Sequence, residues 1–305
     1  MKKYVVVGLG VQGLKRIKYL KKNNVITVDP FKKSDYNYLE LVSKNLYNVV
    51  IICVPDSDKE KIIEFCIKNK KHFLIEKPFP FIKEKRIKFF SNLAKKNKVI
   101  GYIAYNHRFE PNFEELKKIL LKNEIGKIYS CKLFYGNGTS QLVKKSPWRD
   151  KGLGVIGDLG SHLLDICNYW FNVKPKKFDY FNYNRFENKA PDHSKIIFRE
   201  NNILFDLEMT LCMWRNHFTC DILGEKGSAH IYSLCKWDET HLIIRKRIFP
   251  SGKPKERIYK LKMDDPTWEK ELIYFKKLIK NKMYQSFEKD IWINNLFKTI
   301  KRKIK

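Results

Sequence analysis

Hydrophobic positions divide the chain into two stretches with different rhythms. In the first hundred residues, short apolar runs alternate with amphipathic segments whose apolar residues recur about every 3.6 positions. Strands that alternate with helices are typical of a doubly wound parallel sheet. The run at 49–54 is apolar throughout, as in a central parallel strand covered on both faces. We expect strands at 4–7, 25–28, 49–54, 72–75 and 99–104, and helices at 11–22, 59–70 and 83–97.

Between residues 106 and 125 this rhythm changes. A helix predicted at 111–122 leads to a long strand at 126–135, and a glycine-containing loop leads to a helix at 156–171. The strands that follow are joined by short polar turns, which predicts an antiparallel or mixed sheet. The chain is therefore predicted to be α/β, with a parallel-sheet domain at 1–118 and an α+β domain at 119–305. In the second domain we expect strands at 178–184, 194–199, 203–211, 217–222, 228–234, 241–247 and 256–261, and closing helices at 267–280 and 286–303.

Length and apolar content fit two globular domains. The chain has 305 residues, of which 43% are hydrophobic and 14% aromatic, and this argues against disorder. No apolar run approaches the roughly 20 residues that span a bilayer. The N-terminus enters a strand without the longer apolar region of a signal peptide. Seven scattered cysteines form no C-x-x-C pair and indicate neither a disulfide framework nor a zinc site. We expect a cytoplasmic protein with free thiols.

The formal net charge of +29 is large, but its distribution does not favour a nucleic-acid partner. Of the 62 basic residues, 51 are Lys and only 11 are Arg, and they are spread along the whole chain. A surface that reads DNA uses Arg for bidentate contacts, whereas Lys, Asn, Ile, Phe and Tyr share A/T-rich codons. We therefore expect no nucleic-acid partner. A positive field favours anionic substrates such as sugar phosphates, nucleotide sugars or acidic sugars.

The first motif with chemical meaning is G-x-G-x-x-G at 8–13. It directly follows a predicted strand and opens a predicted helix, which is the context that a dinucleotide-binding loop requires. Gly8 permits the tight turn, Gly10 lets a pyrophosphate approach the backbone, and Gly13 lets the helix pack on the strand. The N–H groups of the helix start favour phosphate binding. The alternative is a glycine turn that binds nothing.

Asp29 ends the second predicted strand, 21 residues after Gly8. This is the expected place for an acid that bonds the ribose hydroxyls of the adenosine. Its charge would repel a 2′-phosphate, so NAD(H) is favoured over NADP(H). Lys32 and Lys33 weaken this preference, and a turn-forming role before Pro30 is the alternative.

Two further motifs place titratable groups in predicted loops. Lys77, in Glu76-Lys77-Pro78, follows a parallel strand, at the end of the sheet where ligands gather, and could stabilise a forming alkoxide. In the glycine stretch at 152–165, Asp158 and His162 are four residues apart and would share a helix face. A carboxylate beside a histidine can act as an acid–base unit. The alternatives are a surface lysine at Lys77, a helix N-cap at Asp158, a packed structural histidine, and an Asp158–His162–Asp165 metal site. The metal site has few ligands, and we expect Gly160 to break the helix.

Taken in order, these motifs resemble those of the glucose–fructose oxidoreductase/inositol dehydrogenase (Gfo/Idh/MocA) family. The resemblance covers essentially the whole chain. It rests on the glycine fingerprint, Glu-Lys-Pro, the stretch Tyr105-Asn106-His107-Arg108-Phe109-Glu110-Pro111, Pro147-Trp148-Arg149, Gly-Leu-Gly…Asp-x-Gly-x-His, Gly-Glu-Lys-Gly at 224–227 and Ser286-Phe287-Glu288-Lys289-Asp290.

The resemblance implies a Rossmann domain, a C-terminal α+β domain with a large, mostly antiparallel open sheet, and a homo-oligomer (dimer or tetramer) formed through that sheet. It implies hydride transfer between a nicotinamide and a hydroxyl or carbonyl carbon of a sugar, cyclitol or nucleotide sugar. Lys77 would hold the reacting oxygen, His162 would be the acid/base and Asp158 its partner. Arg108, Trp148 and Arg149, with Asp158 and His162, would contact the substrate. Cofactor contacts would come from Gly8, Gly10, Val11, Gln12, Gly13, Asp29, Val54, Pro55, Glu76, Lys77 and Asn106.

The sequence also departs from the family pattern. The usual Thr-Pro-Asn and the following His are absent at 54–60, which reads Val-Pro-Asp-Ser-Asp-Lys-Glu, and Leu153 stands where glycine is typical. The chain is short for the family, so a loop that selects the substrate is expected to be reduced. Two other hypotheses stay open. One is a catalytically silent relative that acts as a sensor or assembly partner. The other is an enzyme that recycles tightly bound NAD in a reaction with no net redox change.

Overall fold

The computed structural model describes residues 3–20, 24–79, 83–284 and 287–304. These residues form two compact units, Met1–Asn106 with Trp268–Asn294, and His107–Thr267 with Asn295–Lys305. The sequence-based division into 1–118 and 119–305 differs in two ways. The first unit ends before the helix that begins at Pro111, and a late helical segment returns to it. That return is explained by packing, because Leu272, Phe275 and Leu278 are buried in the core cluster of the first unit.

A five-stranded parallel sheet forms the centre of the first unit. Its strand order is β2-β1-β3-β4-β5, so the chain moves outward in one direction from β1 to β2 and in the other from β3 to β5. This confirms the predicted doubly wound sheet. The strands are β1 (Lys3–Val7), β2 (Val25–Val28), β3 (Tyr47–Ile52), β4 (His72–Glu76) and β5 (Gly101–Ala104).

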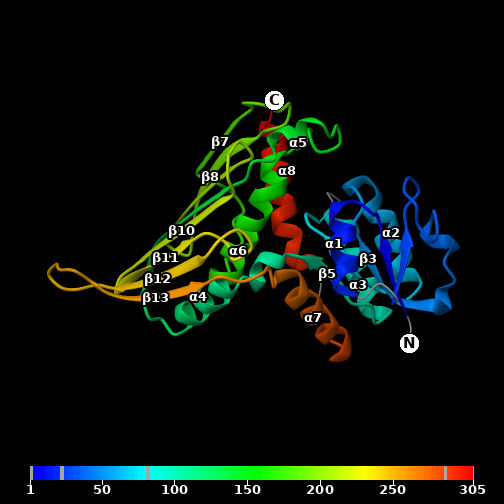
Figure 1. Cartoon of the computed structure of the whole chain (residues 1–305), viewed down its shortest axis with the longest axis horizontal. Coiled ribbons are helices and arrows are strands. Elements are labelled where there is room, and N and C mark those ends of the chain that lie inside the picture. The colour runs from blue at the N-terminus through cyan, green and yellow to red at the C-terminus, as the bar shows by residue number, and fades with distance from the viewer. Residues whose placement is uncertain (1–2, 21–23, 80–82, 285–286, 305) are drawn as a thin grey trace. The chain divides into compact units, whose positions relative to one another are not determined.

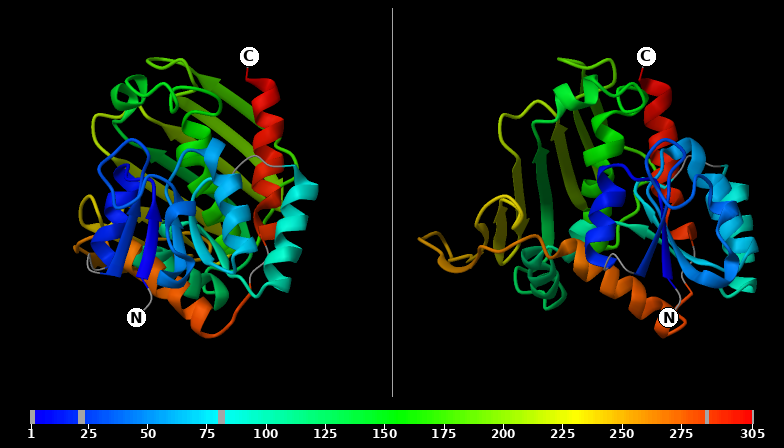
Figure 2. Two further views of the ribbon diagram at one scale, coloured as in Figure 1. Left: turned by 90° about the vertical axis from the view of Figure 1, so that its right-hand side faces the viewer. Right: turned by 45° about the vertical axis from the view of Figure 1, so that its right-hand side comes forward.

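Helices cover both faces of this sheet. Figure 2 shows α1 and α7 on one face and α2 and α3 on the other. Right-handed crossovers on the two sides of β1 produce this arrangement. Short 3-10 turns, rather than an α-helix, connect β2 to β3. The helices are α1 (Val11–Leu20), α2 (Asp56–Lys68), α3 (Glu84–Lys96) and α7 (Thr267–Lys280).

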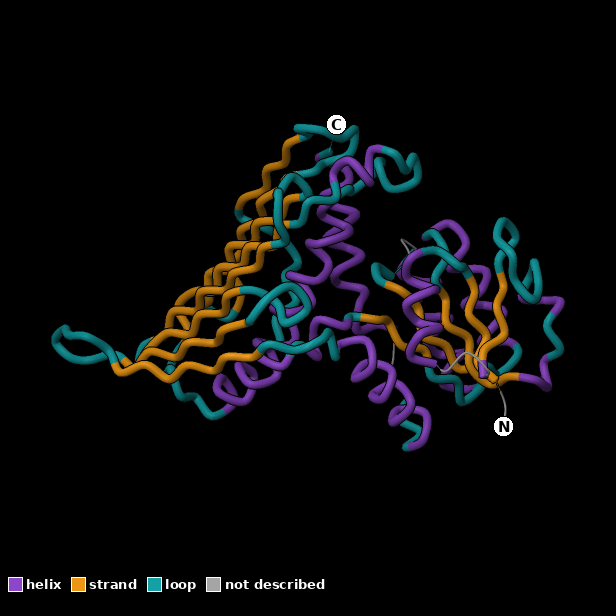
Figure 3. Tube along the Cα trace, in the orientation of Figure 1, coloured by secondary structure: helices purple, strands orange, loops and turns teal. Residues whose placement is uncertain are grey.

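The second unit contains one eight-stranded sheet, drawn as a continuous row of strands in Figure 3. Its order is β13-β12-β11-β10-β6-β9-β8-β7, and every pairing is antiparallel except β6 with β9. The predicted large, mostly antiparallel sheet is therefore confirmed. Its strands are β6 (Ile128–Gly136), β7 (Tyr180–Asn184), β8 (His193–Glu200), β9 (Ile203–Thr210), β10 (His217–Gly224), β11 (Gly227–Tyr232), β12 (Thr240–Lys246) and β13 (Lys255–Leu261).

Helices of the second unit lie along one face of this sheet (Figure 1). They are α4 (Pro111–Leu121), α6 (Ser161–Phe171) and the second-unit part of α8 (Ile291–Lys303). A short helix, α5 (Ser140–Lys144), was not predicted from the sequence. The 3-10 turn Phe287–Asp290 precedes α8, while Ser286, where the predicted last helix starts, lies outside the described residues. Among the helices of the described residues, none has the length and apolar character needed to cross a membrane.

The expected helix break at Gly160 is wrong. A π-helical turn at Ile156–Gly160 runs directly into α6, and Gly160 itself has helical dihedral angles. A Cβ at this position would come within 2.8 Å of the Met209 sulfur on β9. A larger residue would require the Met209 side chain to shift, so glycine favours close packing of the helix on the sheet.

Candidate functional site

The glycine loop after β1 is built as a phosphate cradle requires. Gly8 has a φ of +91°, and a Cβ there would lie 2.6 Å from the Cys53 carbonyl oxygen. A Cβ on Gly13 would lie 1.9 Å from the Gly8 oxygen. The protein itself therefore demands glycine at both positions. At Gly10 a Cβ would meet nothing within 4 Å, so the space beside it is open for a ligand to approach the backbone.

Asp29 connects the end of β2 to this loop. Its Oδ2 accepts the Leu9 N–H at 2.7 Å, and its Oδ1 accepts the N–H groups of Phe31 and Lys32 at 2.9 and 3.0 Å. The turn-forming role that we considered is therefore present. A carboxylate offers about four acceptor positions, so three backbone bonds leave capacity for a ribose hydroxyl. Lys32 donates its Nζ to the Leu9 oxygen at 2.8 Å, which places a cation in the same loop.

Sheet topology gathers the other predicted cofactor residues at one edge of the first unit. Val54 and Pro55 follow β3, Lys77 follows β4, and Asn106 follows β5. These strands are adjacent and parallel, so their carboxyl ends lie beside the glycine loop after β1. Within this unit, one edge therefore carries every residue predicted to contact the cofactor. These residues fit a dinucleotide, although the arrangement does not itself show one bound.

Glu76 belongs to a buried ion cluster directly before Lys77. Arg16 on α1 donates from Nε to Glu76 Oε1 and from Nη2 to Glu271 Oε2, both at 2.7 Å. The Tyr102 hydroxyl donates to the other Glu271 oxygen at 3.3 Å. Burial raises the pKa of Glu271 to about 7, with Glu76 adding to the rise and Arg16 opposing it. Glu76 was predicted from the sequence to contact the cofactor; in the structure its carboxylate accepts a hydrogen bond from Arg16.

This cluster makes the stability of the first unit depend on pH. Because the folded-state pKa of Glu271 is raised, its contribution is full below the ordinary carboxyl range and is lost as pH rises through about 7. We expect Glu271→Gln, which cannot ionise, to lose less stability than the wild type between about pH 5 and about pH 8, by about 2 to 3 kcal/mol. Thermal unfolding of both proteins across this range measures the difference. A constant difference would show that Glu271 does not titrate there.

Lys59, which sequence analysis did not single out, lies on the other side of the Glu-Lys-Pro motif. It is 2% exposed, and its Nζ donates to the Glu76 and Pro78 carbonyl oxygens at 2.7 and 2.9 Å. The same nitrogen forms an ion pair of 2.7 Å with Asp56. Burial lowers the pKa of Lys59, and Asp56 opposes this shift. In a chain with 51 lysines, no sequence signal separates this one from surface lysines.

In the second unit, His162 lies on the first turn of α6 in an aromatic and basic surrounding. It is 6% exposed and stacks on His107, with ring centroids 3.9 Å apart and planes 18° apart. Tyr135 on β6 packs near both rings. Lys236 Nζ lies 3.4 Å from His107 Nε2. His107, Tyr135 and Lys236 were missed as site residues; only His107 had a signal, because it lies inside the Tyr-Asn-His-Arg-Phe stretch.

Asp158 lies one turn before His162 and is partly exposed. Arg149 donates from Nη2 to Asp158 Oδ2 at 3.3 Å, so two predicted substrate residues contact each other. Gly152 and Gly154 have positive φ angles in the loop that leads to this turn. Leu153 is 6% exposed, so the residue that departs from the family pattern fills a buried position.

Arg108 and Trp148 differ in their surroundings. Arg108 donates from Nε and from Nη2 to the two carboxylate oxygens of Asp165, which is 1% exposed on α6. This pair fixes the turn that carries His107 against the helix that carries His162. It also occupies Asp165, one member of the metal site that we considered. Trp148 is 58% exposed on the loop after α5.

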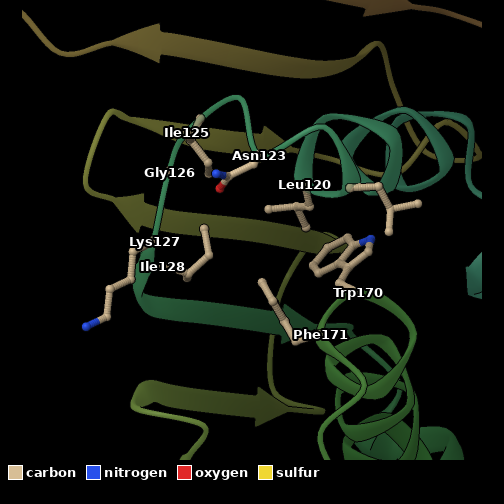
Figure 4. A pocket seen from close by; sticks show the side chains of 9 residues that line it. Leu120, Asn123, Ile125, Gly126, Lys127, Ile128, Trp170 and Phe171 are labelled. Carbon is tan, nitrogen blue, oxygen red and sulfur yellow. The ribbon is translucent and has the colours of Figure 1, made fainter.

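The pocket in Figure 4 is separate from these groups. It has a volume of about 260 Å³ and lies between the end of α4, the start of β6 and the end of α6. Its walls are mainly apolar, and none of the predicted catalytic residues lines it. Its lining includes Leu120, Ile125, Ile128, Trp170 and Phe171.

Comparisons with known proteins agree with both units. A family model described as an oxidoreductase family with an NAD-binding Rossmann fold matches residues 2–105, and one described as the Gfo/Idh/MocA C-terminal domain matches residues 113–230. Glucose-6-phosphate 3-dehydrogenase of Bacillus subtilis is 31% identical over 145 residues. That stretch is 46% of this chain and 40% of that relative, so the match spans less than half of the relative's length.

Solved structures match the whole chain. Levoglucosan dehydrogenase in complex with NADH has a TM-score of 0.80 at 17% identity, covering 99% of this chain and 97% of that one. An oxidoreductase of Desulfitobacterium hafniense, described as NADPH-dependent, has a TM-score of 0.81 at 16% identity, covering 99% and 96%. At these identities the likeness establishes the fold.

Proposed function

This chain belongs to the Gfo/Idh/MocA family, and on that premise we propose that it is an NAD(P)-dependent oxidoreductase acting on a sugar, cyclitol or nucleotide sugar. A bound nicotinamide would accept or supply the hydride at a hydroxyl or carbonyl carbon. One observation carries the proposal. The open glycine loop, Asp29 and Lys77 follow β1, β2 and β4, so all three lie at the same edge of the parallel sheet. The matched relatives act by name on sugars, and the class of substrate is proposed from them.

We assign to Lys77 the binding of the reacting oxygen of the substrate. An ammonium group at the end of a parallel strand can donate a hydrogen bond to a hydroxyl and stabilise the alkoxide character that develops on it. The two neighbouring peptide carbonyls are anchored by Lys59, which limits how far the Lys77 backbone can move.

We assign to His162 the transfer of the substrate's hydroxyl proton. In oxidation it accepts the hydroxyl proton, and in reduction it returns that proton to the carbonyl oxygen. Asp158 and Arg149 form a partly exposed ion pair one turn away, where they can receive polar groups of the substrate. Trp148 offers an exposed aromatic face to a sugar ring. Arg108 is assigned a positioning role, because Asp165 holds its guanidinium.

We propose NAD(H) as the preferred cofactor because the Asp29 carboxylate would lie beside a 2′-phosphate. The mutant Asp29→Asn removes the charge and keeps only one of the two oxygens that accept the loop N–H groups. It is expected to raise the affinity for NADPH relative to NADH by about tenfold, since Lys32 remains as a local cation. Fluorescence titration with the two nucleotides gives the ratio.

Asp35→Asn is the matched control for this change. Asp35 lies in the same loop and accepts the Thr27 N–H and hydroxyl, each at 2.8 Å, but it does not contact the glycine loop in the described structure. Its ratio should match that of the wild type. An unchanged ratio in Asp29→Asn would remove Asp29 from cofactor selection.

We propose further that the open face of the eight-stranded sheet forms a homo-oligomer. Alternate residues of β8–β10 are buried under the helices, and those between them, such as Lys195, Asp206 and Asp221, point to the opposite face.

The net charge of +29 supports the proposal that the substrate is anionic. The cytoplasmic location stays a prediction.

The test of the proposed function is a screen of sugars, sugar phosphates, cyclitols and nucleotide sugars with NAD⁺, followed by absorbance of the reduced nicotinamide. Turnover of one class supports the proposal and identifies the substrate. Bound cofactor that does not exchange, together with product formation without net reduction, would favour the recycling enzyme. Nucleotide binding without turnover of any class would favour the silent relative.

A further inference from the structure

We propose that Lys59 is a positioning residue for Lys77: it fixes the Glu76-Lys77-Pro78 backbone by binding the carbonyl oxygen on each side of Lys77. The inference rests on the proposed function only in so far as it assigns Lys77 to catalysis. The geometric part concerns the first unit alone.

The contacts of Lys59 account for all three N–H donors of its ammonium. Two go to the Glu76 and Pro78 carbonyl oxygens and one to the Asp56 carboxylate. Glu76 is the last residue of β4, so the sheet no longer holds the chain beyond it. Lys59 supplies from α2 the anchors that the strand cannot provide.

The Glu76 side chain is anchored independently. Arg16 is 3% exposed and binds this carboxylate from α1, on the face of the sheet opposite α2. Two buried cations therefore hold the residue before Lys77, one by its side chain and one by its backbone. Burying a cation costs desolvation free energy, and two of the three partners of Lys59 are the carbonyl oxygens of the residues before and after Lys77. We conclude that Lys59 serves the placement of this side chain as well as the packing of α2.

The chain provides a matched comparison in Lys71. It is 7% exposed, lies in the same unit, and donates its Nζ to the Lys44 and Tyr47 carbonyl oxygens at 2.7 and 2.9 Å. These carbonyls lie in the 3-10 turn before β3 and at the first residue of β3, at the end of the sheet opposite to the one that carries Lys77. Lys71 thus shares the burial and the bonding of Lys59 but not its position.

The experiment compares Lys59→Met and Lys71→Met in the full chain. We expect both to lower the unfolding temperature. Only Lys59→Met should lower kcat, by about 10- to 100-fold, with the Kd for NADH within a few-fold of the wild type. Backbone hydrogen exchange, measured on the same proteins, should increase at the N–H groups of residues 76, 77 and 79 in Lys59→Met and at those of 44–47 in Lys71→Met. Lys59→Gln, which keeps a neutral donor, is the milder variant if Lys59→Met does not fold.

Two results would overturn the inference. One is a kcat in the Lys59 variants equal to that of Lys71→Met. The other is exchange at 76–79 that does not change. If the wild type turns over no tested alcohol, the proposed function is what fails, and the positioning of Lys77 is then decided by hydrogen exchange alone.

Discussion

Replacing Lys77 by methionine is expected to reduce turnover by about 10²- to 10³-fold while the affinity for NADH stays within a few-fold of the wild type. Methionine keeps the apolar stem but removes the group that would stabilise the reacting oxygen. We assign the main cofactor contacts to the glycine loop and Asp29, whose hydrogen bond through the Leu9 N–H does not involve Lys77. The loss should therefore appear in kcat, as expected for an interaction made in the transition state.

Steady-state kinetics with the identified substrate and NADH titration measure the two effects separately. Lys61→Met, an exposed lysine on α2, serves as the control and should retain full activity. Turnover of Lys77→Met within a few-fold of the wild type would show that Lys77 is not a catalytic residue.

The second large effect is expected for His162→Asn. Removing the acid/base should lower kcat by about 10²- to 10⁴-fold and abolish the limb of the pH–rate profile that reports its protonation. Asparagine keeps a polar side chain on the first turn of α6, so the stack with His107 is weakened but the helix packing is retained. The pH–rate profiles of both proteins measure this.

The same unit offers a matched control for His162. His230 pairs with a carboxylate, since its Nδ1 lies 2.6 Å from Asp221 Oδ1, and it lies on β11 of the sheet rather than on α6. His230→Asn should leave both kcat and the pH profile unchanged. A profile that keeps its shape in His162→Asn would assign the proton transfer to another group, and the stacked His107 would be the first to examine.

The parallel sheet and its ligand edge could be predicted from the sequence because the signals are local. Apolar runs gave β1 to β5 to within a few residues, and the glycine fingerprint directly follows β1. Topology then determines that residues after β1, β3, β4 and β5 share an edge, because parallel strands end on the same side. The second sheet was predicted as antiparallel or mixed from equally local signals, but which strands form its one parallel pair, β6 with β9, was not specified.

The features that could not be predicted depend on contacts between distant segments. Glycine is unfavourable inside helices, yet Gly160 lies in a continuous helical segment, where the absence of a Cβ leaves room for the Met209 side chain. Arg108 was expected at the substrate, but its partner Asp165 lies 57 residues away. The return of α7 to the first unit follows from an apolar face whose partner no local pattern reveals. In each of these three cases the structure depends on a contact with a residue far away in the sequence.

The family and the fold rest on matches to both units, whereas the roles of Lys77, Asp158 and His162 rest on their positions and chemistry. Binding of the nicotinamide nucleotide is the step that every assigned role requires.

The most direct measurement is titration of the purified protein with NADH and with NADPH, followed by tryptophan quenching and energy transfer to the nicotinamide. The account predicts saturable binding of NADH and weaker binding of NADPH. If the protein binds neither nucleotide and carries none from purification, the dehydrogenase proposal is contradicted.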